Sequence, residues 1–140
     1  MGFFSALFIV FILTMIALFQ TLPSYPRASD LPSVTIQSCY DGDTYTTTER
    51  EKIRLACIDT PELRGKKTDP ISAKAERDYL NNLVTGSRVT IRRITEDRYG
   101  RTVAELSKGP MNIQEHLVEK GFARIYERYS SQCEWSMNKI

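Results

Sequence analysis

The chain has 140 residues, of which 19 are lysine or arginine and 17 are aspartate or glutamate, so its net charge is +2. This length fits one domain better than two. The near balance of charge excludes a histone-like mode of nucleic-acid binding, but it is compatible with a local basic groove.

The charged residues all follow residue 26, and residues 3–19 are almost entirely apolar. The length of that run is at the lower limit for a segment that spans a bilayer, roughly 17 to 25 residues. The run is also longer than the apolar core of most signal peptides. Because no basic residue precedes it and no A-x-A site follows it, an uncleaved membrane anchor and a secretory signal remain alternatives. We expect an exported protein, secreted or periplasmic, with residues 1–21 as signal peptide or anchor.

The apolar run of residues 3–19 is the predicted membrane tether, if the segment is not cleaved. Residues 22–32, which include Pro23, Ser24 and Pro26, are typical of a linker. The folded domain is therefore expected to span residues 33–140.

The domain is predicted to begin with a hairpin. Residues 34–37 and 45–48 flank the turn Asp41-Gly42-Asp43-Thr44, and Asp-Gly between extended runs favours a tight connection. Residues 49–52 turn again into a third strand, so the first three strands are expected to form a meander.

The third strand is predicted over residues 53–58, a short apolar run with charge before it and proline after it. Arg54 is out of phase with its apolar neighbours and should point to the opposite face. Pro61 cannot donate a ladder hydrogen bond, so the strand should end there and leave Asp59 and Glu62 at its mouth.

A helix is predicted next, after the basic loop of residues 63–69. Asp69 is the candidate N-cap and Pro70 occupies the first turn. Gly86 is the candidate residue that ends the helix. The apolar stripe expected to face the core consists of Ala73, Leu80, Leu83 and Val84.

Two strands and a second helix complete the predicted domain. The strands are expected at residues 88–95 and 101–108, with Val89 and Ile91 on one face and a loop at residues 96–100. Gly109-Pro110 ends the second strand. The helix at residues 112–120 should bury Ile113, Leu117 and Val118 and end at Gly121. This order favours an α+β fold, a small closed or partly closed barrel with flanking helices.

Two acidic turns are the candidate metal site. Asp43 and Asp59 lie at the ends of neighbouring predicted strands, and hard cations such as Ca²⁺ take carboxylate and carbonyl oxygens. Together with the carbonyl of Thr60, they could hold one ion. Asp41-Gly42 alone would be read as a plain turn, but a second acidic turn on the adjacent strand favours a shared site.

Two arginines and a glutamate are the candidate catalytic groups. Arg54 and Arg101 could bind a phosphate bidentately, since a guanidinium keeps its proton. Glu62 could act as general base toward an attacking water. The plain alternatives are salt-bridged strand arginines and a surface glutamate, and only the fold decides whether the three side chains meet.

The three cysteines, Cys39, Cys57 and Cys133, fit an exported protein in which one disulfide persists. Three single pairings stay open, and Cys57 could also be a small buried hydrophobe. Wide cysteine spacings and a single histidine, His116, argue against a zinc site.

Three motifs occur in order: Asp41-Gly-Asp-Thr44, Arg54-Leu-x-x-Ile-Asp59-Thr-Pro-Glu62 and Asp97-Arg-Tyr-Gly-Arg101. Together they resemble the motifs of staphylococcal-type thermonucleases, over about residues 34–129. The resemblance implies a five-stranded OB-type β-barrel with two flanking α-helices, the third, C-terminal helix being largely missing here. It also implies an enzyme that hydrolyses DNA and RNA with Ca²⁺ and leaves 3′-phosphorylated products. We expect the protein to be a monomer.

Carried over residue by residue, the resemblance assigns every part of the site. Calcium ligands are Asp43, Asp59 and the Thr60 carbonyl, with Asp41 nearby; the catalytic residues are Arg54, Glu62 and Arg101; substrate-contacting residues are Tyr99 and Tyr129. Further contacts to the nucleic-acid backbone are expected from some of Arg64, Lys66, Lys67, Arg92, Arg93 and Arg98. Residues 63–69 differ from the family's loop, so a preference for DNA or RNA does not carry over.

Two departures leave alternatives open. With only residues 130–140 in place of the third helix, either the domain is less stable or Cys133 tethers the tail by a disulfide. A catalytically silent OB-type module that binds single-stranded nucleic acid or protein is the alternative function. A third possible function is that of an exported interaction module unrelated to nucleic acid. That function would not explain why the acidic residues and the arginines occur together.

Overall fold

The computed structural model describes residues 28–60 and 70–139. In chain order its elements are η1 (Ala28–Asp30), β1 (Ser33–Asp41), β2 (Thr44–Thr47), β3 (Lys52–Leu55), β4 (Ile58–Asp59), α2 (Pro70–Val84), β5 (Arg88–Glu96), β6 (Thr102–Lys108), β7 (Met111–Asn112), α3 (Ile113–Glu119), β8 (Arg124–Ile125), η2 (Glu127–Gln132) and α4 (Glu134–Met137).

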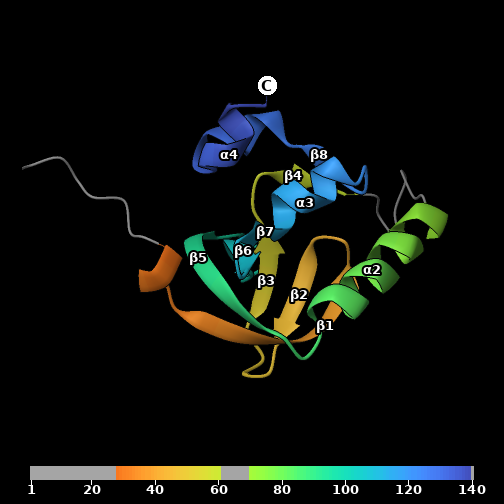
Figure 1. Ribbon diagram of the computed structural model, residues 1–140, viewed down its shortest axis with the longest axis vertical. Helices are drawn as coiled ribbons and strands as arrows, with labels where there is room; N and C mark the ends of the chain where they lie inside the picture. The colour runs from red at the N-terminus through yellow and green to blue at the C-terminus, as the bar shows by residue number, and fades with distance from the viewer. Residues whose placement is uncertain (1–27, 61–69, 140) are drawn as a thin grey trace, which may run out of the picture.

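Five of the described strands, β1, β2, β3, β6 and β5, pair with one another in a circuit. Within the described residues, one six-stranded sheet has the order β3-β2-β1-β5-β6-β7, and β3 also pairs with β6. The β3–β6 pairing is parallel, and the other pairings of the circuit are antiparallel. This arrangement confirms the predicted α+β class and the OB-type order of strands (Figure 1).

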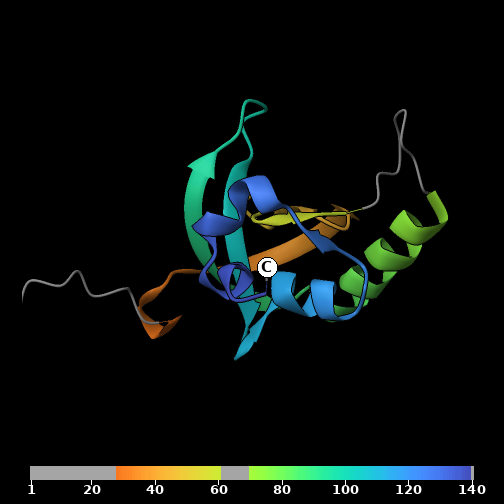
Figure 2. The same ribbon diagram turned by 90° about the horizontal axis from the view of Figure 1, so that it is seen from above.

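The core lies between the inner face of this sheet and two helices. Buried strand residues alternate with exposed ones, as in β3, where Ile53 and Leu55 are buried on either side of Arg54. The helix α2 packs along β1, and α3 packs against β6 (Figures 1 and 2). Of the apolar side chains predicted to face the core from the helices, Ala73, Leu80, Val84, Ile113 and Leu117 are buried, and Leu83 and Val118 are partly buried.

The expected continuous strand over residues 53–58 is wrong. The strand β3 ends at Leu55, residues 56–57 form a turn in which Cys57 has a φ of 67°, and β4 then pairs with β8. A positive φ is uncommon for a residue with a side chain, and here tertiary contacts hold it. Tyr126 N–H donates to the Cys57 carbonyl at 2.8 Å, and Cys57 is covalently bonded to Cys133.

The C-terminal segment is short but anchored. Cys57 and Cys133, 76 residues apart, form a disulfide with an S–S distance of 1.99 Å, which selects one of the three pairings left open by the sequence. Cys39 lies outside this bridge, and its thiol donates to the Asp41 carbonyl. In place of a long third helix, the tail forms η2 and the four-residue α4, which lie over one end of the strands (Figure 1).

Local capping chemistry agrees with most predicted helix ends. Asn112 caps α3 by accepting a hydrogen bond from Glu115 N–H at 3.0 Å. Gly86 and Gly121 follow the two helices with φ values of 74° and 76°, which glycine adopts without steric cost. The predicted cap Asp69 is outside the described residues. In the part of the chain that is described, no helix is both long and apolar enough to cross a bilayer.

The side chain of a buried glutamine pairs with main-chain groups of β6, as a neighbouring strand would. Gln114 is fully buried on α3, where its Nε2 donates to the Ala104 carbonyl and its Oε1 accepts from Leu106 N–H, both at 3.2 Å. Replacing Gln114 with methionine keeps the volume but leaves a buried main-chain N–H without this acceptor. We expect the free energy of unfolding to fall by about 1–3 kcal/mol, measured by urea denaturation.

The matched control for this change is Gln37→Met, at an exposed position of β1. We expect it to change the free energy of unfolding by less than about 0.5 kcal/mol. Equal stability of the two variants would mean that the Gln114 hydrogen bonds contribute nothing to the fold.

Candidate active site

Three segments that are distant in sequence meet at one end of the sheet. The β1–β2 turn carries Asp43, β3 carries Arg54, and the loop before β6 carries Arg101. Arg54 forms an ion pair with Asp43 at 3.0 Å, and an Arg101 terminal nitrogen donates to Thr44 Oγ1 at 3.1 Å. They meet because β3 pairs with β2 on one side and with β6 on the other.

Asp43 is a buried carboxylate with several partners. Its residue is 8% exposed, and its two carboxylate oxygens accept hydrogen bonds from Thr60 Oγ1 at 2.9 Å and Thr44 Oγ1 at 3.1 Å. Burial raises the pKa of Asp43 to about 6, and Asp41 adds to this rise, whereas Arg54 opposes it. The site therefore holds a carboxylate whose charge is only partly compensated by the protein.

The pKa of Asp43 makes stability depend on pH. Its ordinary pKa is 3.8, so between about pH 4 and pH 6 the Asp43 carboxyl binds more protons in the folded chain than in the unfolded chain, and its contribution to stability falls as pH rises. Asp43→Asn removes the buried charge. We expect it to be about 2–3 kcal/mol more stable than the natural chain at pH 8, with the difference shrinking toward pH 4.

The measurement is urea denaturation at both pH values with chelator present. Glu49→Gln, at an exposed position, is the control and is expected to change stability little at either pH. A loss of stability in Asp43→Asn at pH 8 would show instead that the Arg54 ion pair outweighs the cost of burial.

Arg54 is fixed by three acceptors. Its NH1 donates to the Leu55 carbonyl at 2.8 Å, and its NH2 donates to the Ile58 carbonyl at 3.1 Å and faces Asp43. The two carbonyls lie on either side of the turn that joins β3 to β4. The guanidinium group thus holds this turn and is itself held in one orientation.

Arg101 is fixed by its own loop. Asp97 Oδ2 accepts from Arg101 Nε at 2.8 Å, and Asp97 Oδ1 accepts from the main-chain N–H groups of Tyr99 and Arg101. Burial acts to raise the pKa of Asp97, but these hydrogen bonds outweigh it and leave that pKa below its ordinary value. Asp97 is therefore a charged anchor for the whole loop.

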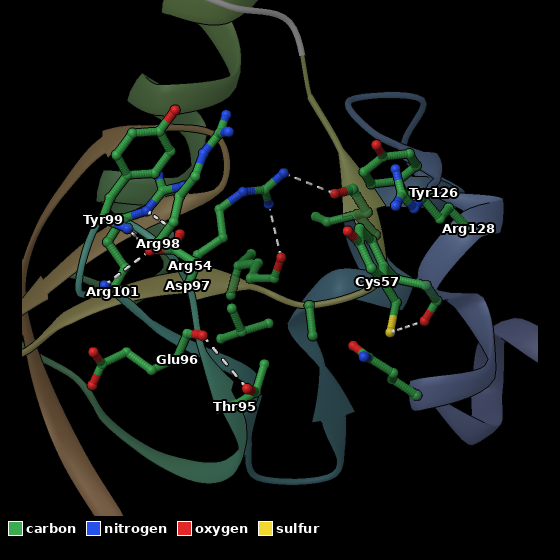
Figure 3. Close-up of a pocket in the computed structure, with 16 residues that line it drawn as sticks. Arg54, Cys57, Thr95, Glu96, Asp97, Arg98, Tyr99, Arg101, Tyr126 and Arg128 are labelled. Atoms are coloured by element: carbon green, nitrogen blue, oxygen red, sulfur yellow. Dashed lines mark hydrogen bonds and ion pairs between the residues drawn. The ribbon is translucent and has the colours of Figure 1, made fainter.

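A pocket of about 630 Å³ opens beside the two arginines. In Figure 3, Arg54 lies between a group formed by Tyr99 and Arg101 and a second group formed by Tyr126 and Arg128. The residues lining it are Arg54, Leu55, Ala56, Cys57, Ile58, Thr95, Glu96, Asp97, Arg98, Tyr99, Arg101, Val103, Tyr126, Arg128, Tyr129 and Gln132.

The walls of the pocket combine arginines with exposed tyrosine rings. The guanidinium carbons of Arg98 and Arg101 lie 4.9 and 5.5 Å from the centroid of Tyr99. On the opposite wall, Arg128 lies 5.5 Å from the centroid of Tyr129. Positive charge beside a π-face is a chemistry that suits a phosphate attached to an aromatic base.

The predicted metal ligands lie next to the pocket. Thr60 and Asp43 are joined by a hydrogen bond, and Asp59 precedes Thr60 at the end of β4. Arg124 makes both of its hydrogen bonds to Asp59 through the single oxygen Oδ2, at 3.1 and 2.6 Å. Oxygen donors of this kind fit Ca²⁺. Among the described residues, no three His, Cys, Asp or Glu side chains form a metal-binding group, and the predicted set contains only two carboxylates.

The predicted general base and the predicted basic contacts to nucleic acid have different outcomes. Glu62 lies outside the described residues, as do Arg64, Lys66 and Lys67. Arg92 and Arg93 are engaged in ion pairs with Glu105 and Glu51, which favours a structural role for both. Arg98 lines the pocket.

Several site residues escaped the sequence analysis. Thr44 stands in the first motif, but nothing in the sequence indicated that its hydroxyl reaches Arg101. The pairing of Arg124 with Asp59 depends on the contact between β4 and β8. Tyr126 and Arg128 did carry a signal, because basic and aromatic residues alternate between Arg124 and Tyr129.

Comparison with known proteins identifies the fold and its family. The family model described as "Staphylococcal nuclease homologue" matches residues 52–139. The chain belongs to the staphylococcal nuclease family. An "Uncharacterized endonuclease" of Haemophilus influenzae is 31% identical over 125 residues, which is 86% of this chain and 66% of that protein.

Two further relatives carry more specific names. "Staphylococcal-like nuclease CAN1" of Arabidopsis thaliana is 30% identical over 115 residues, covering 79% of this chain and 34% of the plant protein. The "Thermonuclease" of Staphylococcus intermedius is 31% identical over 99 residues, covering 66% of this chain and 58% of that protein. This member of the staphylococcal nuclease family thus spans from about a third to two thirds of the length of these three relatives.

Proposed function

We propose that this protein is a Ca²⁺-dependent nuclease that hydrolyses phosphodiester bonds of DNA or RNA and leaves 3′-phosphorylated products. The observation that carries the proposal is the pair of fixed guanidinium groups, Arg54 and Arg101, which line one pocket beside the buried carboxylate of Asp43. Family membership and the names of the relatives support the same activity.

The two arginines stabilise the charge that develops during hydrolysis. In-line attack on a phosphodiester places negative charge on the equatorial oxygens, and groups that are already oriented toward this charge act on the transition state. Arg54 and Arg101 are each fixed by at least two hydrogen bonds. They therefore need little reorganisation when the reaction occurs.

The acidic residues divide into ligands and a base. Asp43, Asp59 and the Thr60 carbonyl would hold Ca²⁺, which when bound acts as a Lewis acid on a phosphoryl oxygen. Glu62 follows Thr60 by two residues in the chain and is proposed as the general base that takes the proton of the attacking water. The 5′ oxygen of the next nucleotide leaves.

The pocket walls are proposed to bind the nucleotide on either side of the reacting phosphate. Tyr99 and Tyr129 are 68% and 41% exposed, so part of each side chain is accessible to a nucleotide. Arg98 and Arg128 lie beside them and would add contacts to the backbone that weaken as salt rises.

Export is proposed for this protein. The disulfide between Cys57 and Cys133 supports it, because such bonds persist in oxidising compartments. The apolar run of residues 3–19 supports it from the sequence, as signal peptide or as membrane tether. We also propose that the active form is a monomer.

The test is cleavage of a fluorescently labelled single-stranded oligonucleotide of DNA and one of RNA by the purified chain. We expect fragments ending in a 3′-phosphate with Ca²⁺, and none after a chelator is added. Binding of the oligonucleotide without cleavage would favour the silent OB-type module. Neither binding nor cleavage would favour an interaction module.

A further inference from the structure

Thr44 connects the two halves of the proposed site through one hydroxyl group. Its Oγ1 accepts a hydrogen bond from an Arg101 terminal nitrogen at 3.1 Å and donates one to Asp43 Oδ1 at 3.1 Å. The main chain of Thr44 is fixed as well, because it begins β2 and pairs with Asp41 on one side and Arg54 on the other.

A threonine hydroxyl has one hydrogen and two lone pairs. When ionised, the Asp43 carboxylate only accepts hydrogen bonds, so the hydrogen of the Thr44 hydroxyl points toward Asp43, which leaves a lone pair for Arg101. The buried carboxylate thus fixes the direction of the hydroxyl, and the hydroxyl fixes the guanidinium group. No other arrangement of the proton satisfies both contacts.

Arg101 has its second anchor at Asp97, which accepts from Nε at 2.8 Å. Two acceptors on different nitrogens define the plane of a guanidinium group. Among the described residues, no protein hydrogen bond reaches the remaining nitrogen, NH2. That nitrogen belongs to a group that lines the pocket, which makes it the candidate contact for a phosphate.

We propose that Thr44 is a positioning residue for Arg101: its hydroxyl, oriented by Asp43, holds the guanidinium group in the plane that the transition state requires. The inference rests on the proposed nuclease function and adds to it a residue that is neither a ligand nor a phosphate contact. Through this hydroxyl, the proposed metal ligand Asp43 is linked to Arg101.

The test compares Thr44→Val, which keeps the shape of the side chain and removes the hydroxyl, with Thr44→Ser, which keeps the hydroxyl. At saturating Ca²⁺ we expect Thr44→Val to lower kcat by about 10–10²-fold, with KM changed less than about twofold. Thr44→Ser should recover most of the rate. The control is Thr46→Val, two residues along the same face of β2, which should keep the natural kcat.

A double-mutant cycle separates positioning from a general structural effect. If Thr44 acts through Arg101, adding Thr44→Val to Arg101→Ala should cost less than about twofold in kcat. The proposal is overturned if Thr44→Val costs the same factor with and without Arg101. It is also overturned if Thr46→Val loses as much activity as Thr44→Val.

A second readout does not depend on activity. Hydrogen exchange of the Arg101 guanidinium Nε–H, followed by NMR in the full chain, should be slow in the natural chain and in Thr44→Ser, and faster in Thr44→Val. An inactive natural chain with this exchange pattern would refute the proposed function and support the positioning. Unchanged exchange in Thr44→Val would refute the positioning, whatever the activity.

Discussion

Replacing Arg101 with alanine is expected to lower kcat for phosphodiester cleavage by about 10²–10³-fold, the usual cost of losing one charge-stabilising group. The side chain is one-quarter exposed, and its hydrogen-bond partners are the polar groups of Asp97 and Thr44 and not the apolar core. The free energy of unfolding should therefore change little. The measurement is single-turnover cleavage of a labelled oligonucleotide, with urea denaturation of the same preparation.

Two control variants separate charge from geometry. Arg101→Lys keeps the positive charge but lacks the planar fork that binds two oxygens, so it should recover only part of the rate. Arg88→Ala removes an exposed arginine at the start of β5 and should leave kcat unchanged. A rate for Arg101→Ala within about threefold of the natural chain would contradict the electrostatic role assigned to this arginine.

Arg54 is expected to behave differently from Arg101. Alanine at this position should also reduce cleavage by about 10²–10³-fold, but its guanidinium group satisfies the carbonyls of Leu55 and Ile58 and faces the buried Asp43. The same substitution should therefore destabilise the turn between β3 and β4. These contacts predict a measurable loss of stability as well as a loss of activity.

Removing the disulfide is expected to have the largest effect on stability. Cys57 and Cys133 close a loop with a sequence separation of 76, and the chain-entropy model assigns about 4.5 kcal/mol to a loop of this size. The double variant Cys57→Ala, Cys133→Ala should lose about that much free energy of unfolding. It should also cleave more slowly, because Tyr129 and Gln132 line the pocket from the segment that the bridge holds.

A thiol reductant provides the matched experiment. Reductant should lower the unfolding midpoint of the natural chain toward that of the double variant and leave the double variant unchanged. Cys39 is present in both chains, so any effect through its thiol would appear in both. An equal shift in the two chains, or no shift in the natural chain, would contradict a stabilising role for the bridge.

Much of the fold followed from local sequence because its determinants are local. The Asp41-Gly42 turn sits at the tip of the first hairpin as expected, and Asn112 and Gly121 bound the second helix. Alternation in Ile53, Arg54 and Leu55 correctly placed the arginine on the face opposite the core. In each case the preference arises from backbone dihedrals or side-chain direction within a few residues.

The break in the third strand could not be predicted in this way. The run of residues 53–58 has the composition of one buried strand, yet Cys57 adopts a positive φ and bonds to Cys133. Contacts with a segment about 70 residues away override the local preference. Strand propensity is context-dependent for this reason.

The sequence by itself indicated the candidate site residues: two acidic turns, two arginines and a glutamate at spacings that match the staphylococcal nuclease family. Only the tertiary structure decided how Asp43, Arg54 and Arg101 meet and which cysteines pair. The parallel pairing of β3 with β6 brings the first and second halves of the site together. Local preferences determine where the chain turns and which face of a strand a side chain occupies. Pairing between distant segments depends on how much surface the whole chain buries, and no short stretch of sequence contains that information.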